Sequence, residues 1–383
     1  MKERGVHLQY SFEADGQRGA AVQNPLFDLL SAVREHGSIQ RAAEAIGASY
    51  RHVWGALKHW QEVLGEPLVH WSQGHPARLT PFAERLLWAE THARARMAPH
   101  IEALRAELER VLAEALDGSQ QVLTVYASHD LALPALRETA RGTERLHIDL
   151  RFAGSIDALR ALAEGRCTVA GFHVPPLTEG AALFEKGLEP LLVPGRHKLI
   201  GCTRRTQGLI VAAANPLALH GLADCAARRA RFAWRQDGSA THLLTQHLLR
   251  QAGLEARALV AARSTEDSHN AVAAAVAGGL ADAGIGLEAA ARAFGLGFVA
   301  LAEDDYFLVC LADALEQPPV LALRRALQDP AWQQAVAALP GYRVTQPGKV
   351  LSLTRALPWW NFRKSKATPR PRIQCGAASA ERS

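Results

Sequence analysis

Apolar residues between positions 24 and 68 recur at spacings of three and four, with short breaks between the runs. This spacing places them on one face of a helix, so the segment predicts three consecutive helices. The residues concerned are Phe27, Leu30 and Val33 in the first helix, Ala42, Ala43 and Ile46 in the second, and Val53, Trp54, Leu57 and Trp60 in the third. Two short strands, on either side of "SQGHPA", are predicted to follow.

The breaks carry residues that start or turn a helix. Ser38 and Ser49 are positioned to cap the second and third helices, and Gly47 supplies a turn between them. Helices that cross steeply over a tight turn need small side chains at the crossing, which Ala42 and Ala43 provide. The pattern predicts a helix-turn-helix, with the two strands as its wing.

The third helix has the chemistry of a DNA-recognition helix. Its first turn carries hydroxyl and basic side chains, and no acidic residue occurs in it before Glu62. Such groups suit phosphates and base edges in the major groove. The wing adds a histidine and an arginine, and Thr80 is expected to cap the next helix. The residues predicted to contact double-stranded operator DNA are Ser38, Gln40, Arg41, Ser49, Tyr50, Arg51, His52, Trp54, Lys58, His75 and Arg78.

The stretch "GSIQRAAEAIGASYRHVWGALKHWQEVLGEPLV", followed by "LTPFAERLL", resembles the DNA-binding domain of molybdate-responsive ModE regulators. LysR-type regulators share the general pattern, but their recognition helix usually starts with Ser-Gln. The Ser49-Tyr50 pair and Trp54 are closer to ModE. The resemblance covers about a fifth of the chain. This sequence departs from it in the wing, which has the single glycine Gly74 where ModE wings are often glycine-rich.

A long amphipathic helix is predicted from Pro81 to Leu116, interrupted only by Pro99. Its apolar stripe favours packing against a second copy of the chain, although packing on its own domain is the alternative. A homodimer, or a tetramer built from it, would read two operator half-sites. The stripe consists of Leu86, Leu87, Ala93, Met97, Ile101, Leu104, Leu108 and Leu112.

After residue 121 the pattern changes to strands alternating with helices, which is typical of an α/β domain with a largely parallel sheet. There are too many strands for one small sheet, so two lobes are expected, as in periplasmic-binding-protein domains. The predicted fold class is α+β multidomain. The predicted domains are a winged helix-turn-helix (1–80), a linker and dimerisation helix (81–117), a two-lobed periplasmic-binding-protein-like domain (121–360) and a disordered basic tail (361–383).

Hydroxyl-bearing residues stand where several predicted strands end and helices begin. Ligands of open α/β sheets bind at the carboxyl ends of strands, and helix N-termini offer free N–H groups to an anion. Serines there are more often plain N-caps, and the histidines may equally belong to the core. The residues predicted to bind a ligand are Ser128, His129, Ser155, His173, Arg235, Ser239, Thr241, Ser268 and His269.

Segments such as "GSIDALRALAEGRCTVAGFHV" and "RFAWRQDGSATHLL" resemble the PBP-like domain found with ModE-type helix-turn-helix domains. The resemblance spans most of residues 122–360. It implies an oxyanion held by hydroxyls and backbone amides, most plausibly molybdate or tungstate, as effector. Relatives often have Gly-Ser-Gly-Thr-Arg where this chain has Gly-Ser-Ala-Thr-His, so that His242 replaces a permanent cation with a titratable side chain.

The net charge of +5 does not by itself indicate binding to nucleic acid. The segment from Arg355 to Ser383 alone carries about +6, so the rest of the chain is close to neutral. DNA contact must therefore come from a local basic surface. No membrane span, secretory signal, P-loop, nucleophile elbow or spaced metal cluster is recognisable. Five scattered cysteines indicate buried thiols in a reducing compartment. We expect a cytoplasmic protein with no membrane partner, no enzymatic activity and no metal or cofactor.

These inferences predict a one-component transcription regulator that senses a small oxyanion. Two alternatives stay open. One is a LysR-like regulator that responds to an organic acid or another metabolite, for which an aromatic pocket would be evidence. The other is a molybdenum-cofactor-related protein with an accessory DNA-binding domain.

Overall fold

The computed structural model describes residues 25–71, 75–116, 121–176, 182–357 and 359. The N-terminal domain contains the three predicted helices, α1 (Pro25–His36), α2 (Ile39–Ala45) and α3 (Tyr50–Leu64). Ser38 Oγ accepts the backbone N–H of Arg41, and Ser49 Oγ accepts that of His52. Gly47 adopts a φ of +68°, which glycine reaches without strain. Both caps and the turn are confirmed.

The wing consists of two antiparallel strands, β1 (Val69–His70) and β2 (Arg78–Leu79). Thr80 anchors it to the next helix, because its Oγ1 donates to Pro67 O at 2.7 Å and accepts the N–H of Ala83 at 3.1 Å. The helices and the wing share one buried core, whose central side chains are fully inaccessible. They include Leu30, Val33, Ala42, Val53, Leu68 and Ala83.

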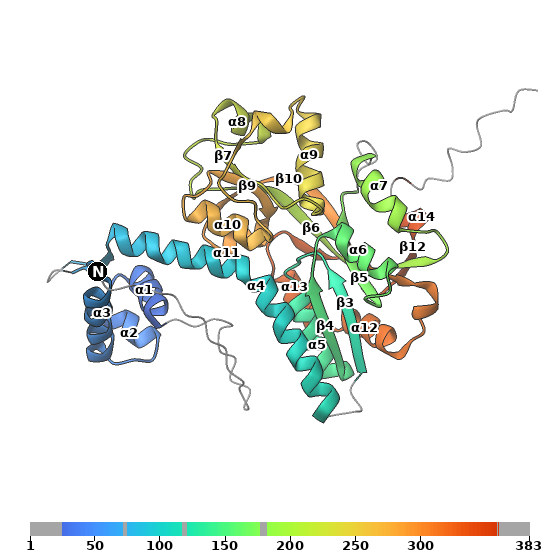
Figure 1. Cartoon of the computed structure of the whole chain (residues 1–383), viewed down its shortest axis with the longest axis horizontal. Coiled ribbons are helices and arrows are strands. Elements are labelled where there is room, and N and C mark those ends of the chain that lie inside the picture. Colours follow the sequence, from blue (N-terminus) through green and yellow to red (C-terminus); the bar gives the residue numbers. More distant parts are fainter. Residues whose placement is uncertain (1–24, 72–74, 117–120, 177–181, 358, 360–383) are drawn as a thin grey trace, which may run out of the picture.

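Helix α4 (Pro81–Leu116) leads from the wing to the C-terminal domain and continues along it (Figure 1). It packs against β4 and α10 of that domain. The ribbon changes direction part-way along its length (Figure 1). Ala95 and Ala106, which are outside the predicted stripe, are buried, whereas Ala93 and Leu104 of the stripe are exposed. Against the two-lobed domain the helix therefore buries Ala95 and Ala106 instead of these two residues, whereas Leu87 of the stripe is buried in the core of the N-terminal domain.

The C-terminal domain has two lobes built on one curled sheet, and the predicted fold class is confirmed. Its strands are β3 (Gln121–Ala127), β4 (Leu146–Phe152), β5 (Val169–Val174), β6 (His197–Val211), β7 (Arg231–Ala233), β8 (Val260–Ala261), β9 (Ala283–Leu287), β10 (Gly297–Leu311), β11 (Tyr342–Val344) and β12 (Val350–Ser352). Its α-helices are α5 (Leu133–Glu144), α6 (Ser155–Ala163), α7 (Ala182–Leu188), α8 (Leu222–Ala227), α9 (Ala240–Gln251), α10 (His269–Ala277), α11 (Glu288–Ala293), α12 (Pro318–Gln328), α13 (Pro330–Ala337) and α14 (Leu353–Ala356).

The strand order in this sheet is β4-β3-β5-β10-β6-β9-β7-β8, with β11 and β12 paired to β6. The prediction of a largely parallel sheet was wrong at its centre, because β6 and β10 run antiparallel to each other and to their other neighbours. Two predicted strands, 198–204 and 208–214, are the single strand β6. Polar residues such as Arg205 and Gln207 resemble a loop in the sequence, but here they continue the ladder.

The two crossing strands define the lobes. The half of β6 before Arg205 and the half of β10 after Asp304 belong to the first lobe, with β3, β4, β5 and helices α5, α12 and α13. The opposite halves belong to the second lobe, with β7, β8, β9 and helices α10 and α11. Residues 203–207 and 302–306 therefore lie at the crossing between the lobes.

Several elements were not predicted, among them α7, α8, α12, α13, β11 and β12. Trp332 of α13 is fully buried, and its Nε1 donates to Ala132 O. Trp359 packs against a buried cluster, and the predicted tail (361–383) lies outside the described residues. Cys167, Cys202, Cys225 and Cys310 are buried free thiols as predicted. In the described ranges, no helix is long and apolar enough to cross a bilayer.

Candidate functional sites

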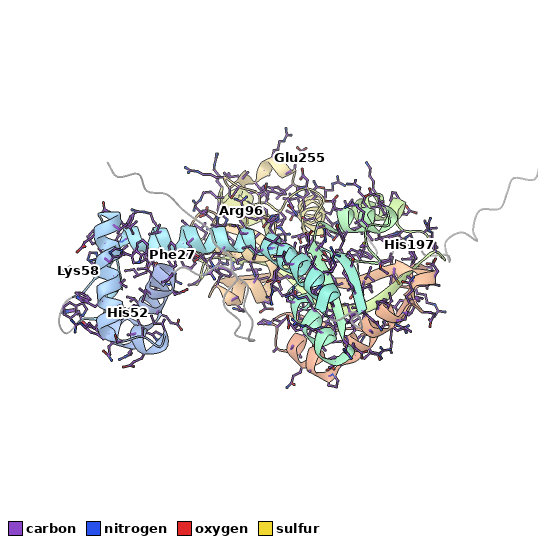
Figure 2. The ribbon with its side chains drawn as sticks, turned by 60° about the horizontal axis from the view of Figure 1, so that its bottom comes forward. Phe27, His52, Lys58, Arg96, His197 and Glu255 are labelled. Atoms are coloured by element: carbon purple, nitrogen blue, oxygen red, sulfur yellow. The ribbon has the colours of Figure 1, made fainter. Side chains whose placement is uncertain are left out.

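The predicted DNA-contacting residues lie on α2, α3 and the wing, and almost all are exposed. His52 and Lys58 extend from α3 at the end of the molecule away from the two-lobed domain (Figure 2). Two residues have other roles as well: the hydroxyls of Ser38 and Ser49 cap helices. Gln40 Nε2 donates to Glu44 within α2. The remaining surface is basic and aromatic, as a DNA contact requires.

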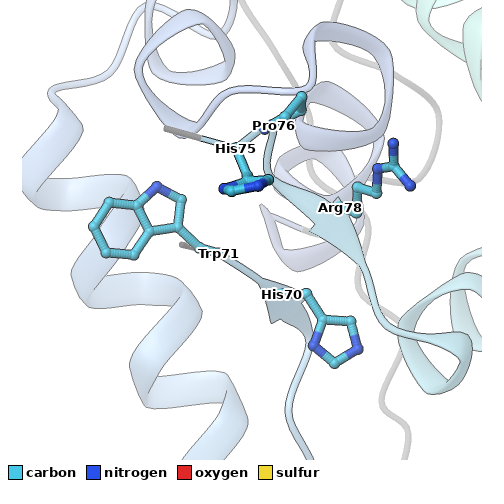
Figure 3. Close-up of a pocket in the computed structure, with 5 residues that line it drawn as sticks. All are labelled: His70, Trp71, His75, Pro76 and Arg78. Carbon is cyan, nitrogen blue, oxygen red and sulfur yellow. The ribbon is translucent and has the colours of Figure 1, made fainter. Parts of the chain in front are cut away.

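An aromatic contact between helix and wing was missed in the sequence. Trp71, at the end of β1, is 52% exposed and makes an edge-to-face contact with Trp54 of α3, with ring centroids 5.7 Å apart. Figure 3 shows Trp71 beside His75, with Arg78 on the adjacent strand, around a hollow in the wing. Two adjacent exposed tryptophans are unusual in a folded domain and indicate a contact surface.

The predicted ligand-binding residues lie at the crossing between the lobes, and most are buried. Ser128 and His129 follow β3, Ser155 begins α6, and Ser239 and Thr241 begin α9. The starts of α6 and α9 meet across the two lobes: a side chain on Gly154 would come within 2.8 Å of Gly238 O. Segments distant in the sequence are therefore brought together.

Arg235 is the buried arginine of this group. Its guanidinium is almost completely buried, and it donates to the backbone carbonyls of Glu266 (3.0 Å) and Asp267 (2.8 Å). Its Nη1 lies 3.2 Å from His269 Nδ1. Burial lowers the pKa of Arg235 to about 10, so the side chain stays protonated at neutral pH. The hydrogen-bond partners of Arg235 are two backbone carbonyls and a histidine ring. In the described part of the chain, no carboxylate forms a hydrogen bond with its guanidinium.

Two further histidines extend this group. The ring of His129 lies 6.4 Å from that of His269 and 4.9 Å from that of Phe152. Burial lowers the pKa of His129 to about 3, and Arg235 and Arg205 add to the shift. Burial and the same two arginines hold the pKa of His269 well below its usual range. Both rings are therefore neutral at physiological pH.

Buried polar atoms without a hydrogen-bond partner occur in the same region. They are the hydroxyls of Ser128, Ser155, Thr203 and Thr241, together with His129 Nδ1 and Gln207 Oε1. An unpaired buried polar group costs about 1–3 kcal/mol, so several in one region indicate a place where a bound group would complete the hydrogen bonding. Four of the six are hydroxyls, which can donate to an anion.

An ion-pair network that the sequence analysis missed fixes the two crossing strands together. Arg205 of β6, fully buried, donates to Asp304 of β10 through Nε and Nη2 (2.8 Å each) and to Asp130 through Nη1 (2.7 Å). His173 Nδ1 lies 2.5 Å from Asp304, and Gln207 Nε2 also donates to that carboxylate. Charged residues inside a strand of otherwise apolar neighbours were the available signal.

Two predicted ligand residues have hydroxyls that are already in use. Ser268 Oγ accepts the N–H of Ala271 and donates to Ala95 O of α4, so it faces the linker helix instead of the group around Arg235. Ser239 Oγ accepts the N–H of His242 as an ordinary N-cap. His173 is bound within the Asp304 network. In the described part of the chain, no cluster of three or more His, Cys, Asp or Glu is placed to hold a metal ion.

Residues 136–328, just over half of the chain, match the family described as PBP superfamily domain. The chain belongs to the PBP superfamily. Residues 26–84 match a second family, described as bacterial regulatory helix-turn-helix protein, lysR family. The chain therefore joins a LysR-type helix-turn-helix domain to a PBP domain, and the site around Arg235 lies within the latter.

Among curated proteins, this PBP-superfamily chain is 26% identical to the uncharacterized protein YvgK of Bacillus subtilis over 201 residues, which are 52% of this chain and 64% of that protein. It is 32% identical to the molybdenum transport protein ModE of Azotobacter vinelandii over 77 residues, 19% of this chain and 28% of that protein. The chain thus covers less than two thirds of either relative. The solved structure of full-length BenM is similar with a TM-score of 0.43 and a sequence identity of 15%. The alignment covers 85% of this chain and 99% of the BenM chain.

Proposed function

We propose that this protein is a transcription regulator that binds operator DNA through its winged helix and a small oxyanion between the lobes of its PBP domain. The observation that carries the proposal is the buried guanidinium of Arg235, held by neutral carbonyls, together with unpaired buried hydroxyls after β3 and at the starts of α6 and α9, those of Ser128, Ser155 and Thr241. An anion there would gain a cation and several neutral donors at once. No turnover is expected.

Molybdate or tungstate is the proposed effector. A tetrahedral dianion presents oxygens in several directions, which suits hydroxyls arriving from separate strands and helices. The short match to the molybdenum transport protein ModE, over 19% of this chain, supports this choice. The neutral histidines near Arg235 add donors without adding charge.

An organic acid is the second candidate. The ring of Phe152 lies against His129, and Gln207 Oε1 can only accept a hydrogen bond. An effector with a carboxylate, a hydroxyl and an apolar part would satisfy all three kinds of group. Calorimetric titration with molybdate, tungstate, sulfate, phosphate and a panel of aliphatic and aromatic carboxylates separates the two candidates, since each predicts saturable binding by a different part of the panel.

DNA contact is proposed for α3 and the wing. Tyr50, Arg51 and His52 are exposed in the first turn of α3, where recognition helices approach base edges. The Trp54–Trp71 pair adds apolar surface that suits thymine methyl groups and deoxyribose. Selection from a pool of random duplexes, followed by gel-shift measurement of the enriched sequence, tests this. Failure to enrich any sequence would contradict it.

Dimerisation is proposed through the exposed face of α4. Leu104 is 50% exposed and Val111 is 52% exposed, while the opposite face of the helix packs on its own PBP domain. Large apolar side chains on a long helix beside a DNA-binding domain favour a second copy as partner. A two-fold dimer would present two recognition helices to a symmetric operator.

A further inference from the structure

Helix α4 contacts both lobes, the second lobe through residues 92–100 and the first lobe from residue 102 onward. Before Pro99, His92 Nε2 lies 3.1 Å from Glu266 Oε2. Arg96 Nε lies 3.8 Å from the same oxygen, and His100, directly after the proline, lies 3.6 Å from Asp267. Figure 2 shows Arg96 on α4 where the helix passes the two-lobed domain. These acidic residues belong to the second lobe.

The later set of contacts joins α4 to the first lobe. Glu102 Oε2 accepts from Arg137 Nη1 of α5 at 3.0 Å. The carbonyl of Ala106, whose side chain is fully buried, lies 3.3 Å from His147 Nε2 of β4. Helix α4 therefore contacts both lobes. An effector that binds between the lobes would change their relative position.

Pro99 stands near the end of the second-lobe set and leaves a specific bond unmade. Proline has no N–H, so the carbonyl of Ala95, four residues earlier, loses its helical partner. The hydroxyl of Ser268 donates to that carbonyl at 3.3 Å. Interior prolines bend helices, and α4 changes direction part-way along its length (Figure 1). Ser268 of the second lobe thus supplies the hydrogen bond that Ala95 O lacks because of Pro99.

The segment that holds α4 also holds Arg235. The backbone carbonyls of Glu266 and Asp267 accept from the Arg235 guanidinium, while their side chains face α4. Burial would raise the pKa of Glu266, but hydrogen bonds from His92 and Ser264 and the charge of Arg96 hold it below its usual value, so it remains a carboxylate. A shift of Arg235 would move this segment and the helix together.

We propose that α4 couples the two lobes to the DNA-binding domain and bends at Pro99. Its contacts to the second lobe are Glu266, Asp267 and Ser268. Its contacts to the first lobe are Arg137 and His147. This rests on the proposed function, because it assigns the regulation of that same site. A change in lobe arrangement must then either bend α4 at Pro99 or break one contact set, and either outcome alters how the winged helices are presented.

The test uses the full chain with spin labels at Val193→Cys and Glu255→Cys, both exposed and on different lobes, in a Cys375→Ser background. Distances between the labels are compared for His92→Gln, Glu102→Gln and the control Arg94→Gln, whose partner Glu90 is on α4 itself. His92→Gln and Glu102→Gln each weaken one contact set by removing an ion pair at its less buried partner. Each is expected to shift or broaden the distance distribution, and Arg94→Gln is expected to match the parent. Unchanged distributions in both variants, with native circular dichroism, would overturn the proposal.

A second measurement separates this inference from the proposed function. The factor by which molybdate changes the dissociation constant of the selected duplex is expected to fall about threefold or more in His92→Gln and Glu102→Gln, and to stay the same in Arg94→Gln. If molybdate does not bind at all, the proposed effector is wrong, and the spin-label distances still decide whether α4 couples the lobes. If both ligands bind and the factor is unchanged in every variant, the coupling role is wrong.

Discussion

The guanidinium of Arg205 forms two parallel hydrogen bonds, each 2.8 Å, with the carboxylate of Asp304. The two residues stand on the antiparallel strands β6 and β10 where these pass from one lobe to the other, and both are completely buried. A second carboxylate, Asp130 at the end of β3, binds the same guanidinium. This network therefore fixes the register of β6 and β10 at the crossing between the lobes, and it holds the segment after β3 that leads into the proposed effector site.

Arg205→Met is expected to destabilise the two-lobed domain by about 3–5 kcal/mol, because it leaves two buried carboxylates without a cation. Chemical unfolding followed by circular dichroism measures the loss. The matched control is Arg204→Met, one position earlier, whose pair with Asp305 is partly exposed. It is expected to cost about 1 kcal/mol or less. Equal effects of the two substitutions would contradict the role given to Arg205.

Arg235→Gln is expected to weaken binding of the effector anion by about tenfold to a hundredfold, because it removes the buried cation of the site while keeping a side chain that can donate. Titration calorimetry with molybdate is the measurement. Arg231→Gln, at the start of β7 and paired with Asp282 at the surface, is the control and should bind like the parent. Unchanged affinity in Arg235→Gln would place the anion elsewhere.

Stability is expected to fall as the pH drops from 7 to 5. The pKa of His129 is lowered to about 3 by burial and nearby arginines, so the unfolded chain takes up a proton before the folded chain does. The contribution is fully present above about pH 6.5 and is lost progressively towards pH 3. His129 alone accounts for about 1–2 kcal/mol at pH 5.

Urea unfolding at pH 7 and pH 5 measures this dependence. His129→Gln should flatten it, because the substitution removes one group whose pKa differs between the folded and unfolded states. His220→Gln, an exposed histidine in the loop before α8, serves as the control. A dependence that is as steep in His129→Gln as in the parent would mean that other groups cause the acid sensitivity.

Arg51→Ala is expected to weaken binding of the selected duplex by about tenfold and to reduce the slope of its salt dependence by about one, if Arg51 contacts a phosphate. Gel shifts at several salt concentrations measure both. Arg257→Ala removes an exposed cation of the PBP domain instead and should leave both unchanged. An equal loss in the two variants would point to general electrostatic attraction.

Leu104→Glu is expected to convert the proposed dimer to a monomer, because it places a charge in the exposed apolar face of α4. Sedimentation velocity of the full chain measures the oligomeric state. Val193→Glu, equally exposed on the first lobe, should leave it unchanged. A Leu104→Glu protein that sediments as a dimer would show that the interface lies on another surface.

The sequence determined the winged helix almost completely. Its helices are amphipathic, its caps are the serines Ser38 and Ser49, and its turn is a glycine, so each element is specified by residues close to it in the chain. The ends of the parallel strands were equally predictable, because hydroxyl residues such as Ser155 mark the helix starts that follow them. Whether these residues bind an effector is still a prediction.

Only the tertiary structure decided how the lobes are joined. Strand β6 contains Arg205 and Gln207 in its middle, and a buried ion pair with a residue about a hundred positions away cannot be inferred from local pattern. The same holds for Ser268: its sequence position suits a ligand, but its hydroxyl completes the hydrogen bonding of α4 at Pro99. Periodicity specifies which face of an element is buried, whereas long-range contacts specify what it is buried against.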